Sequence, residues 1–220
     1  VANQDENMGK LDEFLSRTGI YDNTIVIFMT DNGAWVSADY YNAGMRGAKG
    51  SIYDGGHRVP CFVRWPAGRL RRAGDVQQPA QCQDLLPTLI DLCGITVDDD
   101  IRFDGLSLEP VLRDENELLP DRMMVVQCRE PEKYNSSVIW NSFRLVRGKE
   151  LYDIANDCGQ QNNIAESHPE IVQKMRDHYE RWWAELEEHV MDLEPISVGT
   201  EQENPVSLGH VDWRGPLFWY

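Results

Sequence analysis

The sequence predicts an α/β domain followed by a small antiparallel sheet that packs on a C-terminal helix. Two stretches carry this prediction. Residues 5–30 join a helical pattern to the apolar run "TIVIFMT", and such a run is typical of a strand buried on both faces of a parallel sheet. Residues 122–154 hold short strand-like runs without long helices between them, which favours antiparallel pairing.

The first half of the chain alternates helices with strands. Residues 5–18 have helical spacing and stop before Gly19, which stands where a C-terminal cap belongs. A second strand is predicted at 59–65, and a second helix at 83–94 ends on Gly94 as its cap. The apolar positions of the first helix are Met8, Leu11, Phe14 and Leu15.

The second half changes character. Its predicted strands are 122–129, 136–148 and 150–154. A long helix follows, with Pro169 in its first turn and with Ser167 and Glu170 at the spacing of a capping box. One apolar stripe of this helix is expected to face the sheet. The stripe consists of Ile171, Met175, Tyr179, Trp182 and Leu186.

Three segments are expected from these patterns. Residues 1–115 are predicted to form part of an α/β sheet with covering helices, and residues 116–190 a small α+β subdomain. Residues 191–220 form a tail rich in Pro, Gly and polar residues that ends in "DWRGPLFWY". Aromatic side chains are costly to expose, so we expect the tail to dock on the domain, on a missing part of it or on a partner.

Composition excludes several classes of function. The chain has 220 residues and a formal charge of −16, from 37 acidic and 21 basic residues. This balance argues against general binding to nucleic acid or to anionic membranes. No apolar run approaches the roughly 20 residues of a membrane span.

The cysteines and the N-terminus give weaker indications. The five cysteines form no C-x-x-C pair, and their number neither demands nor excludes disulfides. Cys61 and Cys93 lie within apolar runs and are predicted to be small buried hydrophobes. The first residues lack the apolar core of a signal peptide and open almost directly into a helix, so we expect the chain to start inside a longer protein.

Asp31 and Asn32 follow directly on the first strand. Ligand sites of open α/β sheets lie at the carboxyl ends of strands, and a carboxylate beside an amide oxygen suits Ca²⁺ or Mg²⁺. The same residues followed by Gly33 are also an ordinary turn signal, with the glycine allowing a sharp turn. Two ligands are also too few for Ca²⁺, which takes six to eight oxygens.

Lys49 lies in the second notable segment, "GAKGSIYDGGHRVP". Gly47 and Gly50 would let the backbone approach a ligand, and a lysine there offers a flexible cation for an oxyanion. The alternative is a glycine-rich loop with an exposed lysine. Between Arg46 and Arg72 seven basic residues face one acid, which indicates either a local anion site or a solvated face paired with acids elsewhere. His57 is an acid candidate or a histidine bound to a backbone carbonyl.

The two segments together resemble the sulfatase family of the alkaline-phosphatase-like superfamily. The matching residues are "NTIVIFMTDNG" and "RGAKGSIYDGGHRVPCFVRWPAG", and the resemblance covers about residues 3 to 190. It implies an alkaline-phosphatase-like sheet with covering helices for the first part. It also implies that Asp31 and Asn32 ligate a divalent cation, usually Ca²⁺, and that Lys49 contacts the sulfate group and steadies the leaving oxygen.

Other positions of the motif match with small departures. Arg58 and Pro60 match positions whose role the resemblance implies to be structural, and Asp54 stands where glutamate is commoner. His57 is carried as a further candidate for substrate binding. The loop 34–45 is expected to contribute Trp35, Tyr40 and Tyr41, either to stacking on a sugar ring or to core packing.

One part of the family pattern has no counterpart in this chain. Sulfatases convert a cysteine or serine in C-x-P-x-R or S-x-P-x-R into a formylglycine nucleophile, and no cysteine or serine here has that context. The resemblance therefore implies the C-terminal portion of a sulfatase, inactive alone, whose partner is the missing N-terminal half of the domain. It implies a sulfated small molecule or glycan as substrate and a periplasmic, secreted or lysosomal location. The alternatives are a phosphodiesterase or phosphonate hydrolase of the same superfamily, and a truncated non-catalytic interaction module.

Overall fold

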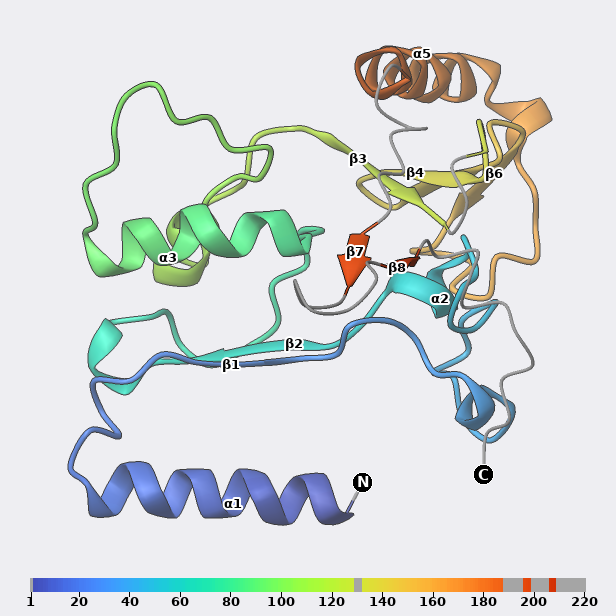
Figure 1. Ribbon diagram of the computed structural model, residues 1–220. Helices are drawn as coiled ribbons and strands as arrows, with labels where there is room; N and C mark the ends of the chain where they lie inside the picture. The colour runs from blue at the N-terminus through green and yellow to red at the C-terminus, as the bar shows by residue number, and fades with distance from the viewer. Residues whose placement is uncertain (1, 129–131, 188–195, 199–205, 209–220) are drawn as a thin grey trace.

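The structure, a computed structural model, describes residues 2–128, 132–187, 196–198 and 206–208 (Figure 1). The helices are α1 (Ala2–Arg17), α2 (Asp54–His57), α3 (Leu85–Cys93), α4 (Glu109–Arg113) and α5 (Pro169–Leu186). The strands are β1 (Val26–Met29), β2 (Cys61–Arg64), β3 (Met123–Gln127), β4 (Ser136–Trp140), β5 (Phe143–Val146), β6 (Glu150–Asp153), β7 (Ile196–Val198) and β8 (Val206–Leu208). Mixed α/β architecture is confirmed.

The helix predicted for the first residues is α1, and its end follows from its glycine. Gly19 has φ +73°, and its N–H donates to Ser16 O at 3.1 Å. The N–H of Ile20 donates to Leu15 O at 3.1 Å. These two bonds form a Schellman motif, which turns the chain toward β1. Leu15 is the buried residue of this helix.

The prediction of a parallel strand buried on both faces was wrong for β1. This strand pairs antiparallel with β2, with Ile27 opposite Val63, and its residues are only half-buried. In Figure 1, α1 and α3 lie on opposite sides of the β1–β2 ribbon. An apolar run indicates that other parts of the protein cover the strand, but it does not indicate which strand pairs with it. Phe62 of β2 is 64% exposed in the part of the chain that is described.

The cysteines also differ from the prediction. Cys61, at the start of β2, and Cys93, at the end of α3, are exposed rather than buried. All five cysteines are free thiols. Burial raises the pKa of the Cys61 thiol even at this partly covered position.

The helix predicted at 83–94 is α3, and it begins and ends close to the predicted bounds. A short 3-10 turn at Cys82–Asp84 precedes it, and Asp84 Oδ2 accepts the Gln81 N–H at 2.8 Å. Gly94 ends the helix in the left-handed conformation. Arg122 Nη1 and Nη2 donate to the two oxygens of Asp84 at 2.6 Å each, so this buried carboxylate ties α3 to the approach of β3.

The small sheet is an antiparallel meander with the order β3-β4-β5-β6. The stretch 136–148, predicted as one strand, forms two strands with a turn at Asn141 and Ser142. Asn141 has φ +51°, a conformation that asparagine tolerates better than most residues.

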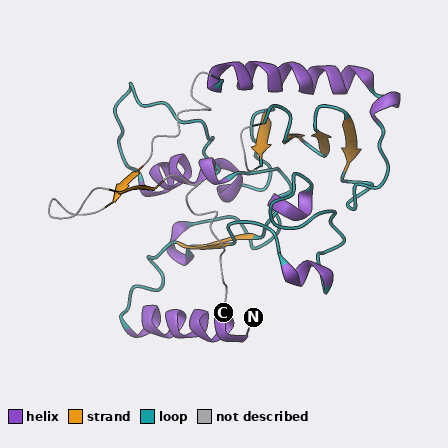
Figure 2. Cartoon of the chain, turned by 45° about the vertical axis from the view of Figure 1, so that its right-hand side comes forward, coloured by secondary structure: helices purple, strands orange, loops and turns teal. Residues whose placement is uncertain are grey.

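Helix α5 covers the small sheet in both views (Figure 2). Its inward row is Met175, Tyr179 and Trp183, which pack against Val138, Leu145 and Leu151. The predicted stripe was right at Met175 and Tyr179, which are buried, and at Ile171 and Trp182, which pack against the same cluster. It was wrong at Leu186, which is 37% exposed, and it missed Trp183, because the inward row advances by four residues. The capping box was also wrong, since the residue before the helix is His168 and no side chain caps it.

Near the end of the chain, the short strands β7 and β8 pair antiparallel, with Ser197 opposite Ser207. The aromatic end of the tail lies outside the described residues, and the division into 1–115, 116–190 and 191–220 stays a prediction. Among the helices that the structure describes, none has both the length and the apolar character that crossing a membrane requires.

Candidate functional site

Asp31 and Asn32 lie directly after β1, at the end of the strand where the sequence places them. Asp31 is exposed and Asn32 is half-buried. The Asn32 Nδ2 group donates a hydrogen bond to Asp31 Oδ2, so the two side chains are in contact. Among the described residues, no three His, Cys, Asp or Glu side chains gather as a complete metal site. The pair can therefore supply two hard oxygen ligands, and further ligands would have to be added.

The chain that follows this pair lies against the glycine-rich segment. The Gly33 N–H donates to Gly56 O at 3.0 Å, and the Lys49 N–H donates to Ala34 O at 2.8 Å. Lys49 itself is exposed. Two segments that the sequence separates by a loop are thus joined through their main chains. The backbone of Lys49 is held beside the segment that carries Asp31 and Asn32.

Gly33 is required for a different reason from the one the sequence indicates. It was predicted to allow a sharp turn, but a Cβ atom at this position would lie 1.8 Å from Gly55 O. A Cβ atom at Gly55 would lie 2.3 Å from Gly47 O. These glycines let two backbones approach each other. Gly47 and Gly50 have φ angles of +84° and +81°, so they serve turns of the loop itself.

Asp54 is fully buried behind this loop and is bound by residues of the small subdomain. Arg144 Nε of β5 donates to Asp54 Oδ1 at 2.9 Å, and Gln160 Oε1 accepts the Asp54 N–H at 2.8 Å. Sequence reasoning missed both partners. The available signal was an arginine inside the apolar strand run "FRLV", where a charge needs a buried counter-ion.

His57 points inward rather than toward solvent, with 14% of its side chain exposed. Its Nε2 atom lies 3.3 Å from Ile52 O and 4.0 Å from Asp54 Oδ1. Burial lowers the pKa of His57, although the neighbouring Asp54 carboxylate acts in the opposite direction. The neutral imidazole is therefore the favoured form in the folded chain. Its role as a substrate contact stays a prediction.

This histidine predicts a pH dependence of stability. Because the pKa of His57 is lower in the folded chain than in the unfolded one, protonation favours unfolding. The contribution is present above about pH 6.5, the unfolded value, and is lost as pH falls through the folded pKa. We expect His57→Gln to lose less stability than wild type between pH 7 and pH 5, measured by urea denaturation. Equal slopes for the wild-type chain and His57→Gln would contradict the assignment.

The cluster of basic residues is divided among several partners. Arg64 pairs with Asp12 of α1 at 2.8 Å. Arg46 Nη1 donates to Tyr152 OH at 3.1 Å and to Gln160 O at 3.0 Å. Of the two readings left open by the sequence, pairing with an acid elsewhere is confirmed for Arg64. Arg46 instead binds a tyrosine hydroxyl and a backbone carbonyl. Among the described residues, the ammonium of Lys49 has no carboxylate within salt-bridge distance, so it can receive an anion.

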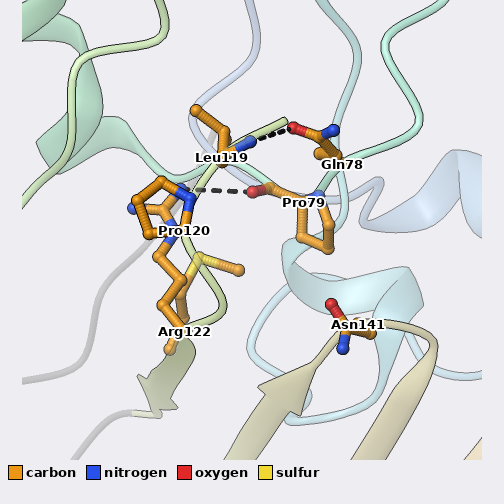
Figure 3. Close-up of a pocket in the computed structure, with 7 residues that line it drawn as sticks. Gln78, Pro79, Leu119, Pro120, Arg122 and Asn141 are labelled. Carbon is orange, nitrogen blue, oxygen red and sulfur yellow. Dashed lines mark hydrogen bonds between the residues drawn. The ribbon is translucent and has the colours of Figure 1, made fainter. Parts of the chain in front are cut away.

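The structure also contains a small cleft of about 40 Å³ away from these residues (Figure 3). Gln78 and Pro79 form one wall, and Leu119, Pro120 and Arg122 form another. Leu119 N–H donates to Gln78 Oε1 at 2.8 Å across it. The Arg122 guanidinium already binds Asp84, so the cleft offers no uncommitted cation for a sulfate. None of the predicted site residues lines it.

A family model described as "Sulfatase" matches residues 1–95, a range that includes Asp31, Asn32, Lys49 and His57. An uncharacterized sulfatase, YdeN of Escherichia coli strain K12, is 33% identical over 216 residues, covering 80% of this chain and 38% of the relative. The chain belongs to the sulfatase family.

Other sulfatases and a solved structure agree with this assignment. An N-acetylgalactosamine-6-O-sulfatase of Bacteroides thetaiotaomicron is 27% identical, covering 80% of this chain and 39% of the relative. The crystal structure of Ps i-CgsB in complex with k-i-k-neocarrahexaose matches with a TM-score of 0.71 and 28% identity, over 81% of this chain and 40% of that one. The alkaline-phosphatase-like fold of the sulfatases is therefore shared. The chain spans about two-fifths of the length of these relatives.

Proposed function

We propose that this chain is the C-terminal part of a sulfatase that hydrolyses sulfate esters. One observation carries the proposal: main-chain hydrogen bonds hold Lys49 beside the segment of Asp31 and Asn32 in a chain of the sulfatase family. An exposed ammonium next to two oxygen ligands that could hold a divalent cation is an arrangement that can bind the singly charged sulfate group of an ester. The rest of the catalytic machinery belongs, on this proposal, to the N-terminal half of the domain.

The metal ligands fit a calcium ion in kind but not in number. Asp31 and Asn32 are adjacent, partly exposed and in contact, and both offer oxygen donors. These two residues would hold Ca²⁺, or Mg²⁺ as the second choice, together with ligands from the N-terminal half. The bound cation would polarise the sulfate, and the formylglycine nucleophile is expected in that same half.

Lys49 supplies the catalytic charge of this chain. When the sulfur–oxygen bond breaks, negative charge develops on the departing oxygen of the ester. The Lys49 ammonium has three rotatable donors on a flexible stem and can approach that oxygen. The Lys49 N–H to Ala34 O bond holds the lysine loop beside the segment of Asp31 and Asn32. On this proposal, the ammonium and the cation held by these two residues therefore face the same sulfate group. His57 is a second, weaker candidate for substrate contact from the same loop.

We infer a sulfated carbohydrate as the substrate class. Two relatives support it by name, the N-acetylgalactosamine-6-O-sulfatase and the protein crystallised with a neocarrahexaose. Trp35, Tyr40 and Tyr41 lie between the two site segments and are 62%, 87% and 79% exposed. Exposed aromatic rings beside an anion site can stack on the apolar face of a sugar. An aryl or alkyl sulfate is the alternative within the same reaction.

Two experiments on the chain and on the full-length protein test this function. The isolated chain is expected to show no turnover of para-nitrophenyl sulfate above a Lys49→Ala control, and to bind Ca²⁺ in calorimetry with a Kd above about 1 mM. The protein that includes the upstream coding sequence is expected to hydrolyse sulfate esters in preference to the matching phosphate. Turnover by the isolated chain, or tight Ca²⁺ binding lost in Asp31→Ala, would contradict the division of the site between two halves.

The same measurements separate the alternatives. Preference for para-nitrophenyl phosphate or a phosphonate ester would identify a phosphoryl-transferring relative instead. Absence of both activities in the full-length protein, with the fold intact, would favour a non-catalytic module. The upstream nucleophile motif is an independent check, because C-x-P-x-R or S-x-P-x-R predicts sulfate chemistry.

A further inference from the structure

Arg144 is a buried arginine that is fully engaged by the segment carrying Lys49 and by its own turn. Its side chain is 6% exposed. Nε donates to Asp54 Oδ1 at 2.9 Å, while Nη1 donates to Asn141 O at 2.9 Å and to Phe143 O at 3.0 Å. The carbonyl oxygens hold the guanidinium at the β4–β5 turn. From this turn, the Arg144 side chain extends to Asp54 of α2.

Gln160 binds the same segment from a strained backbone. It is fully buried and has φ +48°, a conformation that costs free energy for any residue except glycine. Its side-chain Oε1 accepts the Asp54 N–H at 2.8 Å, and its main-chain oxygen accepts Arg46 Nη1 at 3.0 Å. Gln160, in the loop that follows β6, therefore contacts both ends of the segment from 46 to 54.

Arg46 closes the loop at its other end. Its Nη1 also donates to Tyr152 OH at 3.1 Å, and its guanidinium carbon lies 3.8 Å from the ring centroid of Tyr53. The main-chain oxygen of Arg46 accepts the Gly55 N–H at 2.8 Å. Lys49 sits between these fixed ends. Its position relative to Asp31 is thus determined by groups more than 90 residues away along the chain.

Stability alone does not account for this network. A buried ion pair often stabilises a fold no more than apolar residues of the same volume. Here Gln160 Nε2 is buried without a hydrogen-bond partner among the described residues, and Asp54 Oδ2 has only a 3.7 Å ion pair with Nη1 of the exposed Arg58, which adds an energetic cost. An arrangement that keeps strain and unsatisfied groups is expected where geometry, rather than stability, is what the residues provide.

We propose that Arg144 and Gln160 are positioning residues, through which the small C-terminal subdomain holds the Lys49 loop in place for catalysis. The catalytic consequence rests on the proposed function. The positioning of the loop does not, because it can be measured in this chain without any activity.

A second buried pair provides a matched control. Arg122 and Asp84 also join an arginine near the small sheet to a buried carboxylate of the first part, with nitrogen–oxygen distances of 2.6 Å. This pair contacts Gln81, Pro79 and Leu106 rather than the Lys49 loop. Loss of either arginine should weaken the fold, but only Arg144 should affect the loop.

The first experiment is amide hydrogen exchange on the 220-residue chain. In Arg144→Met, exchange at Gly33, Lys49 and Gly55 is expected to accelerate at least about tenfold relative to Arg122→Met, compared at matched global stability in urea. Equal acceleration in both variants would overturn the proposal, and so would unchanged exchange in Arg144→Met. If Arg144→Met does not fold, Arg144→Lys and Gln160→Ala replace it with the same expectation, because a single ammonium cannot serve both Asp54 and the turn.

The second experiment uses the full-length protein and separates the two proposals. Arg144→Met should lower kcat most for esters with poor leaving groups, and should add little to Lys49→Ala, whereas Arg122→Met should leave the leaving-group dependence of wild type. Additive effects of Arg144→Met and Lys49→Ala would overturn the catalytic consequence. A full-length protein without sulfatase activity would refute the proposed function, and the exchange result would still decide whether Arg144 positions the loop.

Discussion

Lys49→Ala in the full-length protein is expected to lower kcat for sulfate esters by about 10²- to 10³-fold, the usual effect of removing one charge-stabilising donor from a transition state. The lysine is exposed, and its main chain is held by Ala34 O at 2.8 Å. The substitution therefore removes the ammonium without disturbing the backbone. The loss should grow as the pKa of the leaving alcohol rises, since a poorer leaving group depends more on the cation.

The control for this effect is another exposed lysine. Lys10→Ala on α1 should leave kcat and its leaving-group dependence at wild-type values. Steady-state assays with a series of aryl sulfates measure both quantities. A Lys49→Ala enzyme that keeps wild-type kcat, or one whose loss is the same for every leaving group, would exclude the role assigned to this lysine.

Gly33→Ala is expected to destabilise the chain by about 2–4 kcal/mol, because an added methyl group would overlap backbone atoms that cannot move separately. The new Cβ would lie 1.8 Å from Gly55 O and 2.8 Å from Gly55 C. Relief requires separation of the two segments, with loss of the Gly33 N–H to Gly56 O bond of 3.0 Å. The same movement would shift Asp31 and Asn32 away from Lys49.

A glycine in open space provides the comparison. Nothing lies within 4 Å of a Cβ atom built on Gly9 in α1, so Gly9→Ala should stabilise the chain by about 0.5–1 kcal/mol through helix propensity. Urea denaturation of both variants measures the difference. If Gly33→Ala were as stable as wild type, the close approach of the two segments would not exist in solution.

The two predictions and the role of Arg144 concern one geometric feature. On the proposed function, Lys49 acts only if it stays at a defined distance from Asp31 and Asn32, and three sets of contacts maintain that distance. Gly33 allows the backbones to touch, the Lys49 N–H joins them, and Arg144 with Gln160 fixes the loop from behind. If a substitution breaks one set of contacts, amide hydrogen exchange should also accelerate at the residues of the other two sets.

The elements near short-range signals were predictable from the sequence. Glycine caps at Gly19 and Gly94 ended the helices that precede them, because the left-handed conformation they adopt is a local property. The order of helices and strands, and the position of Asp31 after a strand, also follow from local patterns. Helix α5 was located correctly, although its predicted inward face missed Trp183 and included the exposed Leu186.

The wrong predictions have a different origin, because they depend on which elements pack against each other. Apolar patterns do not contain that information. The features concerned are the pairing of β1, the exposure of Cys61 and Cys93, and the turn inside 136–148. A capping box likewise requires the chain before the helix to approach at a suitable angle. The backbone instead places His168 before α5.

The sequence by itself determined the family of this protein and the residues proposed to carry its chemistry, since Asp31, Asn32 and Lys49 lie in motifs that can be recognised without the fold. Only the tertiary structure decided how these residues are held together. Arg144 and Gln160 reach Asp54 from about 90 and 106 positions away along the chain. A contact of this kind is created by chain folding and leaves no mark in residue spacing, whereas a cap or a motif depends on neighbours a few residues apart.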